Sequence, residues 1–380
     1  MNNNELMQRE EQDVGSVFTK AQLVEIWKRP VERQYNVAIS KIIEAIQQTD
    51  GDISICFSGG KDSTLLLDMY SEIVSQIKPN AEIDVCFANT TNETNAMISF
   101  VKNFIAEMER KYAVKLNFKE IRPNIPWAKV VQEVGIPLIS KEQAKAIRYI
   151  RRDMDKTGVD YETVIQCANQ SMKSVNELID LGFSASGILS LTGFVSKRKQ
   201  FGKHFMLSKK WLPMLNCGVK ISEQCCAIVK EKPLSRIEGN NIMTGEQASE
   251  SKKREATYLR TGCNYRTSKG VYKSKPFGAM TQDGILFALQ YRGIPICSDY
   301  GEIIKTEDGH YKCTKTNRTG CALCGFGCQY DTERFVRLQE SEPAKVKFAF
   351  KPMDEGGAGY REAIEYMNEH CGTKVKIPKV

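Results

Sequence analysis

The stretch CFSGGKDSTLLL, residues 56–67, places two glycines, a lysine, an aspartate and several hydroxyl groups between two apolar runs. The run over residues 53–57 predicts a short buried strand, and the pattern over residues 63–77 predicts a helix with one apolar face. Because glycine tolerates a positive φ, Gly59 and Gly60 allow a sharp turn from the strand into the helix. The stretch therefore predicts a loop at the start of a helix in which the backbone of two glycines is not covered by side chains.

Such a loop is suited to bind an anion. Its N–H groups turn toward one point, the helix adds the positive end of its dipole, and a diphosphate fits the nest that results. Lys61 adds a full positive charge, and Asp62 either caps the helix or helps to hold a magnesium ion. The hydroxyl groups that can donate to phosphate are those of Ser58, Ser63 and Thr64. The loop is not a Walker A loop, because a serine and both glycines stand immediately before the lysine. The plainer alternative is an ordinary strand-to-helix turn.

Alternation of strands and helices continues after the loop. Residues 83–88 and 114–121 predict further strands, residues 97–112 predict a helix between them, and the pattern returns at residues 241–244. Alternation of this kind predicts an α/β fold of the Rossmann type, with a parallel sheet flanked by helices on both faces.

The rest of the chain predicts a helical insert and a cysteine-rich region. The KRKQFGKHF stretch from Lys197 is either a solvated segment or a contact surface for nucleic acid or polyphosphate. We expect an N-terminal tail and helix over residues 1–50, a nucleotide-binding half over 51–140, a basic helical insert over 141–215, a second half with the metal-binding cysteines over 216–340, and a helical tail over 341–380.

Composition narrows the class of protein. The 380 residues are 41% hydrophobic and 26% charged, so a packed core is expected, and the net charge of +8 weakly favours a phosphate-bearing partner. The polar start of the chain lacks the apolar core of a signal peptide, and no stretch approaches 18 apolar residues. We therefore expect a cytoplasmic protein with no membrane partner. In a reducing compartment its 13 cysteines favour metal binding over disulfides.

Four stretches together resemble a known family. SGGKDS, residues 58–63, is the PP-loop signature of the adenine-nucleotide α-hydrolase superfamily. FANTTNET from Phe87, QCCAIVKEKPL from Gln224 and MTGEQASESKKR from Met243 are similar to motifs of its phosphoadenosine-phosphosulfate (PAPS) reductase branch. The chain departs from those motifs at Asn89, Asn92 and Gln247, where the family commonly has aspartate, proline and arginine. The resemblance runs from about residue 51 to 366.

TGCN, IPICSDYGEI and RTGCALCGFG have close counterparts in an iron–sulfur subgroup of this branch, which is also similar to the ATP-dependent sulfurtransferase of DNA phosphorothioation. The resemblance implies that the loop holds the phosphates of an adenine nucleotide, either ATP with magnesium or an adenylyl sulfate. It places Asn89, Thr90 and Gly245 beside the adenosine, and Glu250, Ser251 and Arg254 at the phosphate or sulfate end. A polar helix start, with a serine as N-cap, is the alternative interpretation of the last group.

The cysteines predict a metal centre. Cys225 and Cys226 are adjacent, whereas Cys321 and Cys324 form a CxxC. Adjacent thiols are poorly placed to bind one metal ion, but each can reach a different iron of a cubane. Sulfonucleotide reductases with a [4Fe–4S] cluster use a similar arrangement, so we expect these four cysteines to hold one. Structural zinc and unligated buried thiols are the alternatives. Four further cysteines compete for these places: Cys263, Cys313, Cys328 and Cys217.

The three histidines lack partners at catalytic or metal-binding spacing, so catalysis is expected to rest on positive charge around phosphates, with Lys61, Asp62 and Arg254 as candidates. In one mechanism ATP adenylylates an acceptor, pyrophosphate leaves, and sulfur replaces the adenylate. In another a thiolate attacks the sulfur of an adenylyl sulfate, and a reductant releases sulfite.

Cys371, in the terminal EHCG stretch, is the candidate nucleophile for the second mechanism, although a helix C-terminus explains the same residues. The sequence favours the ATP-dependent mechanism. A sulfur donor or thiol reductant protein, nucleic acid and a second copy of the chain are possible partners. A third hypothesis is a non-catalytic nucleotide- or nucleic-acid-binding protein with a structural metal site.

Overall fold

The computed structural model describes residues 17–195, 200–201, 205–237 and 240–379, and the chain forms two compact units. Each unit is built from segments that are far apart in the sequence. Unit 1 comprises Met1–Asn89, Asn95–Ile121 and Leu234–Gly320, and unit 2 comprises Thr90–Thr94, Arg122–Pro233 and Cys321–Val380.

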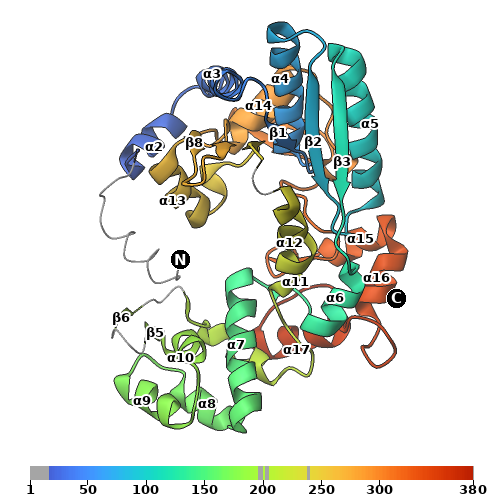
Figure 1. Ribbon diagram of the computed structural model, residues 1–380. Helices are drawn as coiled ribbons and strands as arrows, with labels where there is room; N and C mark the ends of the chain where they lie inside the picture. The colour runs from blue at the N-terminus through green and yellow to red at the C-terminus, as the bar shows by residue number, and fades with distance from the viewer. Residues whose placement is uncertain (1–16, 196–199, 202–204, 238–239, 380) are drawn as a thin grey trace. The chain divides into compact units, whose positions relative to one another are not determined.

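A six-stranded sheet forms the centre of unit 1 (Figure 1). Its strands, in spatial order, are β3 (Lys115–Ile121), β2 (Glu82–Ala88), β1 (Ser54–Cys56), β7 (Ile242–Met243), β9 (Tyr272–Ser274) and β8 (Asn264–Arg266). All neighbouring strands are parallel except β8, which pairs antiparallel with β9. The predicted α/β fold with a mostly parallel sheet is therefore confirmed.

Helices flank this sheet and bury its apolar strands. The main ones are α3 (Val31–Thr49), α4 (Lys61–Ile77), α5 (Asn95–Tyr112) and α14 (Gln282–Tyr291). The helical segment before residue 50 is two helices, α2 (Lys20–Trp27) and α3, because Pro30 lacks an N–H group and disfavours helical geometry in the residue before it. The remaining elements among the described residues of unit 1 are η4 (Ser235–Ile237), η5 (Ala248–Glu250), α13 (Lys252–Thr261), η6 (Ser298–Tyr300), β10 (Ile303–Lys305) and β11 (Tyr311–Cys313).

Unit 2 is mostly helical. Its first helices are α6 (Trp127–Val134), α7 (Lys141–Thr157), α8 (Tyr161–Cys167), α9 (Met172–Asp180) and α10 (Ala185–Thr192). Then follow η2 (Lys209–Asn216), α11 (Gln224–Cys226), the π-helical turn η3 (Ala227–Glu231), α15 (Arg334–Ser341), α16 (Pro343–Phe350) and α17 (Tyr360–Cys371). The short strands β4 (Leu138–Ile139) and β12 (Gly325–Phe326) pair in parallel, and β5 (Phe194–Val195) pairs with β6 (Gln200–Phe201). Most of the KRKQFGKHF stretch lies outside the described residues.

Short α12 (Lys232–Leu234) and η4 (Ser235–Ile237) follow η3.

No helix in the part of the chain that the structure describes is long and apolar enough to cross a membrane.

A buried charge network joins four helices of unit 1. The Asp68 carboxylate on α4 is fully buried and accepts hydrogen bonds from Lys111 Nζ (2.8 Å), Tyr112 OH (2.8 Å) and Arg292 Nε (2.6 Å). The Arg292 guanidinium also donates to Tyr35 OH at 2.9 Å. Since an unpaired buried carboxylate is costly, these contacts stabilise the packing of α3, α4, α5 and the end of α14.

The replacement Lys111→Met is expected to lower the free energy of unfolding by about 1–2 kcal/mol, because Asp68 loses one charged donor but keeps Tyr112 and Arg292. The matched control is Lys115→Met, which removes an exposed ion pair with Glu82 and should cost at most about 1 kcal/mol. Urea denaturation of both variants checks this, and equal losses would contradict the role given to Asp68.

Candidate functional site

The loop after β1 has the geometry that the two glycines predict. Gly59 has a φ of +72°, and a Cβ there would meet Met97 Sδ at 2.4 Å and Val101 Cγ2 at 2.7 Å. Gly60 is the N-cap of α4 and has no side chain to occupy the space over the helix N-terminus. The turn therefore requires glycine for its backbone and for its close packing on α5.

The loop hydroxyls hold the turn together. The Ser58 N–H donates to Ser63 Oγ at 3.1 Å, and the two serine hydroxyls lie 3.0 Å apart. Ser63 Oγ donates to Gly60 O at 2.9 Å, and Thr64 Oγ1 donates to Gly59 O at 3.4 Å. These hydrogen bonds stabilise the turn from within, and in this arrangement the Ser63 and Thr64 hydroxyl groups, which were expected to donate to phosphate, donate to loop carbonyls.

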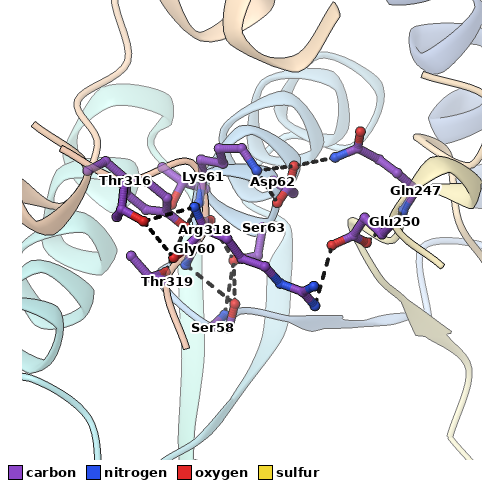
Figure 2. A network of polar contacts seen from close by, with 12 residues as sticks. Ser58, Gly60, Lys61, Asp62, Ser63, Gln247, Glu250, Thr316, Arg318 and Thr319 are labelled. Atoms are coloured by element: carbon purple, nitrogen blue, oxygen red, sulfur yellow. Dashed lines mark hydrogen bonds and ion pairs between the residues drawn. The ribbon is translucent and has the colours of Figure 1, made fainter. Parts of the chain in front are cut away.

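Lys61 is the buried cation of the loop, with 4% of its surface exposed. Its ammonium group lies 3.1 Å from Asp62 Oδ2, and Asp62 Oδ1 also accepts a hydrogen bond from Gln247 Nε2 (Figure 2). Gly245 approaches the same residues closely, because a Cβ there would stand 2.9 Å from the Asp62 carbonyl. The loop and the 243–254 stretch thus form one site within unit 1.

Glu250 organises the second half of this site. Its carboxylate accepts from the Gln247 N–H at 3.3 Å and pairs with Arg254. It also lies 4.0 Å from Arg318 (Figure 2). Ser251 caps α13 by accepting from the Arg254 N–H at 3.3 Å, so the N-cap interpretation of this serine matches the structure. Arg254 and Arg318 place two guanidinium groups on one carboxylate beside the loop.

Sequence reasoning missed Tyr300 and Thr319. Tyr300 OH accepts from the Lys61 N–H at 3.2 Å and lies 2.7 Å from Thr319 Oγ1. Burial raises the pKa of Tyr300, so it stays a neutral phenol. The phenol satisfies the first N–H of α4, a role that no local pattern reveals because Tyr300 follows Lys61 by 239 residues. The IPICSDYGEI motif contains this tyrosine and was the available signal.

Asn89 and Thr90 lie in different units. In unit 1, Asn89 Nδ2 donates to Glu120 Oε1, and its N–H donates to Ile121 O at 3.0 Å. In unit 2, Thr90 Oγ1 donates to Glu93 Oε1 at 2.7 Å and lies 3.5 Å from Cys321 Sγ. Thr90 is therefore placed beside a cysteine of the predicted metal centre.

Asn92 holds the CxxC loop through two hydrogen bonds, a role that the sequence did not indicate. Its carbonyl accepts from the Ala322 N–H at 2.6 Å, and its Oδ1 accepts from the Leu323 N–H at 3.3 Å. The side chain is 1% exposed, and its Nδ2 has no hydrogen-bond partner among the described residues. A buried donor of this kind is available for a group held by the neighbouring thiols.

The four cysteines of the predicted metal centre all belong to unit 2 and influence one another electrostatically. Cys225 and Cys226 lie on α11, and Cys321 and Cys324 lie in the loop before β12. A hydrogen bond from Cys225 and the nearby Lys141 ammonium lower the pKa of Cys226, whereas burial raises the pKa of Cys321 to about 12. Within the described ranges, no group of three or more histidine, cysteine, aspartate or glutamate side chains is placed to hold a metal ion.

The four reserve cysteines are distributed over both units. Cys328 lies in unit 2, where it acts on the pKa of Tyr360 together with Cys324 and Cys225. Cys217 lies in the same unit near Cys371. Cys263 and Cys313 belong to the core clusters of unit 1.

Cys371 is the last residue of α17, and Gly372 follows it in the left-handed conformation that ends many helices. Cys371 is 6% exposed, and burial raises the pKa of its thiol to about 11. A buried thiol with a raised pKa is a poor nucleophile at neutral pH.

Comparison with known proteins finds a similarity to the PAPS reductase domain over part of the chain. Residues 52–161 match the family model of the phosphoadenosine phosphosulfate reductase domain, and this segment contains the loop, β2 and β3. The chain is also similar to the crystal structure of phosphoadenylyl-sulfate (PAPS) reductase from Candida auris in complex with phosphate. That similarity has 12% sequence identity and a TM-score of 0.32, and it covers 75% of this chain and 92% of the other. No curated protein matches the chain.

Proposed function

We propose that the protein is a PP-loop enzyme that binds ATP and releases pyrophosphate, and that it couples this step to sulfur transfer. The observation that carries the proposal is the buried Lys61 ammonium beside a rigid glycine loop at the N-terminus of α4, since this arrangement suits a diphosphate. The match of residues 52–161 to the PAPS reductase domain supports adenine as the nucleotide base.

In this mechanism an acceptor oxygen attacks the α-phosphorus of ATP, the bond from that phosphorus to the α–β bridging oxygen breaks, and pyrophosphate leaves. The Lys61 ammonium group and those N–H groups at the start of α4 that the loop itself does not use bind the departing phosphates, and Asp62 helps to hold magnesium. Arg254, held by Glu250, neutralises charge on the α-phosphate. A sulfur nucleophile then attacks the acceptor carbon that carries the adenylylated oxygen. The bond between this carbon and the oxygen breaks, and AMP leaves with the oxygen.

We further propose that Cys225, Cys226, Cys321 and Cys324 hold a [4Fe–4S] cluster. Two observations support this donor set: all four cysteines belong to unit 2, where their thiols act on one another electrostatically, and the unpartnered Asn92 Nδ2 near the CxxC loop is a donor for a cluster sulfur. The described side chains do not group around a metal ion, so binding of the cluster would have to draw the thiols together. When bound, the cluster supplies a site for sulfur or electron delivery. Zinc on the same thiolates is the rival proposal.

The test uses anaerobically purified protein with ATP and magnesium, and separately with adenylyl sulfate and a thiol. Pyrophosphate release that is lost in Lys61→Ala is the expected result. Sulfite release instead would favour the second candidate, a sulfonucleotide reductase, which the name of the matched domain favours. Nucleotide binding with neither product would favour a non-catalytic role.

Replacing Cys371 by serine is expected to leave product release within about twofold of wild type, because the thiol is buried at a helix end. With a pKa of about 11, its alkylation by iodoacetamide at pH 8 should be about 100-fold slower than that of an ordinary cysteine with a pKa near 9. Mass spectrometry of the tryptic peptide checks the rate. Loss of sulfite release in the variant would instead make Cys371 the nucleophile.

A further inference from the structure

A cavity in unit 1 lies apart from the loop residues described above. Its volume is about 360 Å³, and its walls come from α2, α3, α13, the start of β8 and the segment before α14. Small-molecule sites span roughly 300–1,000 Å³, so this cavity can hold a compact ligand. None of the residues assigned above to nucleotide binding lines it.

The walls of the cavity are mainly apolar. Phe18 and Tyr258, whose rings stack at 5.5 Å, form one side, and Val37 and Met280 are further lining residues. Tyr258 and Cys263 belong to a small core cluster that is separate from the main core of unit 1. Such walls suit an apolar ligand body rather than a hydrated ion.

The charged residues that line the cavity are all cations. They are Arg29, Arg33 and Lys41, and no aspartate or glutamate is among the described lining residues. Arg33, Val37 and Lys41 are spaced by four along α3, so they share one face of that helix. The cavity therefore combines mainly apolar walls with positively charged side chains on one face of α3.

Two of these cations are available for a ligand. The Lys41 ammonium lies 2.7 Å from Glu44 Oε2. The guanidinium groups of Arg29 and Arg33 have neither hydrogen-bond nor ion-pair partners in the part of the chain that is described, and both residues are exposed at the surface. A guanidinium group binds carboxylate, sulfate and phosphate groups through paired N–H donors.

We propose that this cavity binds a small anionic amphiphile, with its apolar body against Phe18 and Tyr258 and its carboxylate, sulfate or phosphate head at Arg29 and Arg33. This function is additional to nucleotide binding and does not rest on it. The charge of the lining selects the anion, and the size of the cavity limits the apolar body to a short chain or one or two rings.

Calorimetric titration of the full-length protein tests the proposal, with octanoate and octyl sulfate as anions and octanol as the neutral analogue. We expect one site per chain, with octanol binding at least about tenfold more weakly. A preference for octanoate or for octyl sulfate identifies the head group. Binding of octanol as tight as that of both anions, or no anion binding at millimolar concentration, would overturn the proposal.

Variants then locate the site. Arg33→Gln should weaken anion binding about tenfold, and Val37→Phe, which fills the cavity without changing charge, should abolish it. Lys28→Gln is the matched control, because Lys28 is exposed, pairs with Glu25 and does not line the cavity. Lys61→Ala should also bind octanoate normally, which separates this site from the nucleotide loop.

Chemical protection provides a readout that does not depend on these variants. Cys263 lines the cavity, so bound octanoate should slow its alkylation by iodoacetamide at pH 9, measured by mass spectrometry of its peptide. Cys313, in the other core cluster of unit 1, serves as the internal control. Octanoate that binds without protecting Cys263, and binds Val37→Phe equally well, would place the ligand elsewhere and refute the assignment.

Discussion

Replacing Gly59 by alanine is expected to weaken ATP binding at least about 100-fold and to lower the free energy of unfolding by about 2–5 kcal/mol. The alanine would have to adopt the φ of +72° that Gly59 has, and its Cβ would stand 2.7 Å from Val101 Cγ2. The Met97 side chain can rotate away from it, but a β-branched valine in a helix has little freedom to do so. The loop must therefore shift, which would misplace the groups that we propose to bind the phosphates.

Gly51→Ala is the matched control. Gly51 also has a positive φ, +76°, but a Cβ there meets no atom within 4 Å. This variant should lose only the backbone contribution, about 1–2 kcal/mol, and should bind ATP as wild type does. Calorimetric titration with ATP and magnesium, together with urea denaturation, measures both effects. Equal ATP affinity in Gly59→Ala and wild type would contradict the role of the loop.

Single replacements of Cys225 or Cys324 by serine are expected to remove most of the iron from anaerobically purified protein. The wild-type protein should contain about four irons and four sulfides per chain and should be brown. Each of these thiols is one of the four proposed ligands, so its loss opens the cluster to solvent and oxidation. Iron and sulfide analysis and the visible absorption spectrum check the result.

The controls for this prediction are Cys263→Ser and Cys313→Ser, because both cysteines belong to unit 1. These variants should retain the full iron content. If instead the wild-type protein is colourless and contains one zinc per chain that the Cys225 variant loses, the four thiols hold zinc. Unchanged metal in every variant would show that these cysteines are not ligands.

The central strand β1 was predictable because a buried parallel strand is apolar on both faces, and residues 53–57 read as one nearly continuous apolar run. The predicted strand over residues 83–88 differs from β2 by one residue at its start, and the predicted helix over residues 63–77 lacks only the first two residues of α4. Two consecutive glycines between such elements also predict the turn, because few other residues accept the positive φ of Gly59.

The contacts that complete the site could not be predicted, because they join residues that are far apart in the sequence. Tyr300 reaches the Lys61 N–H across 239 residues, and Asn92 reaches Leu323 across 231. Cys328 belongs to the same unit as the CxxC cysteines, whereas Cys263 belongs to the other unit. The spacing of the cysteines in the sequence does not reveal this difference. Periodicity describes the environment of one element, whereas these positions depend on how the elements pack.

The position of β1 between β2 and β7 determines the order in which unit 1 can form. Asn241, which precedes β7, donates to Asp52 O across 189 residues. On the ribosome β1 can pair with β2 early, but its other edge has no strand until β7 emerges, on the order of 10–40 s later at typical rates of synthesis. The nascent chain must therefore carry an open sheet edge, a template for aggregation, throughout the synthesis of residues 122–233.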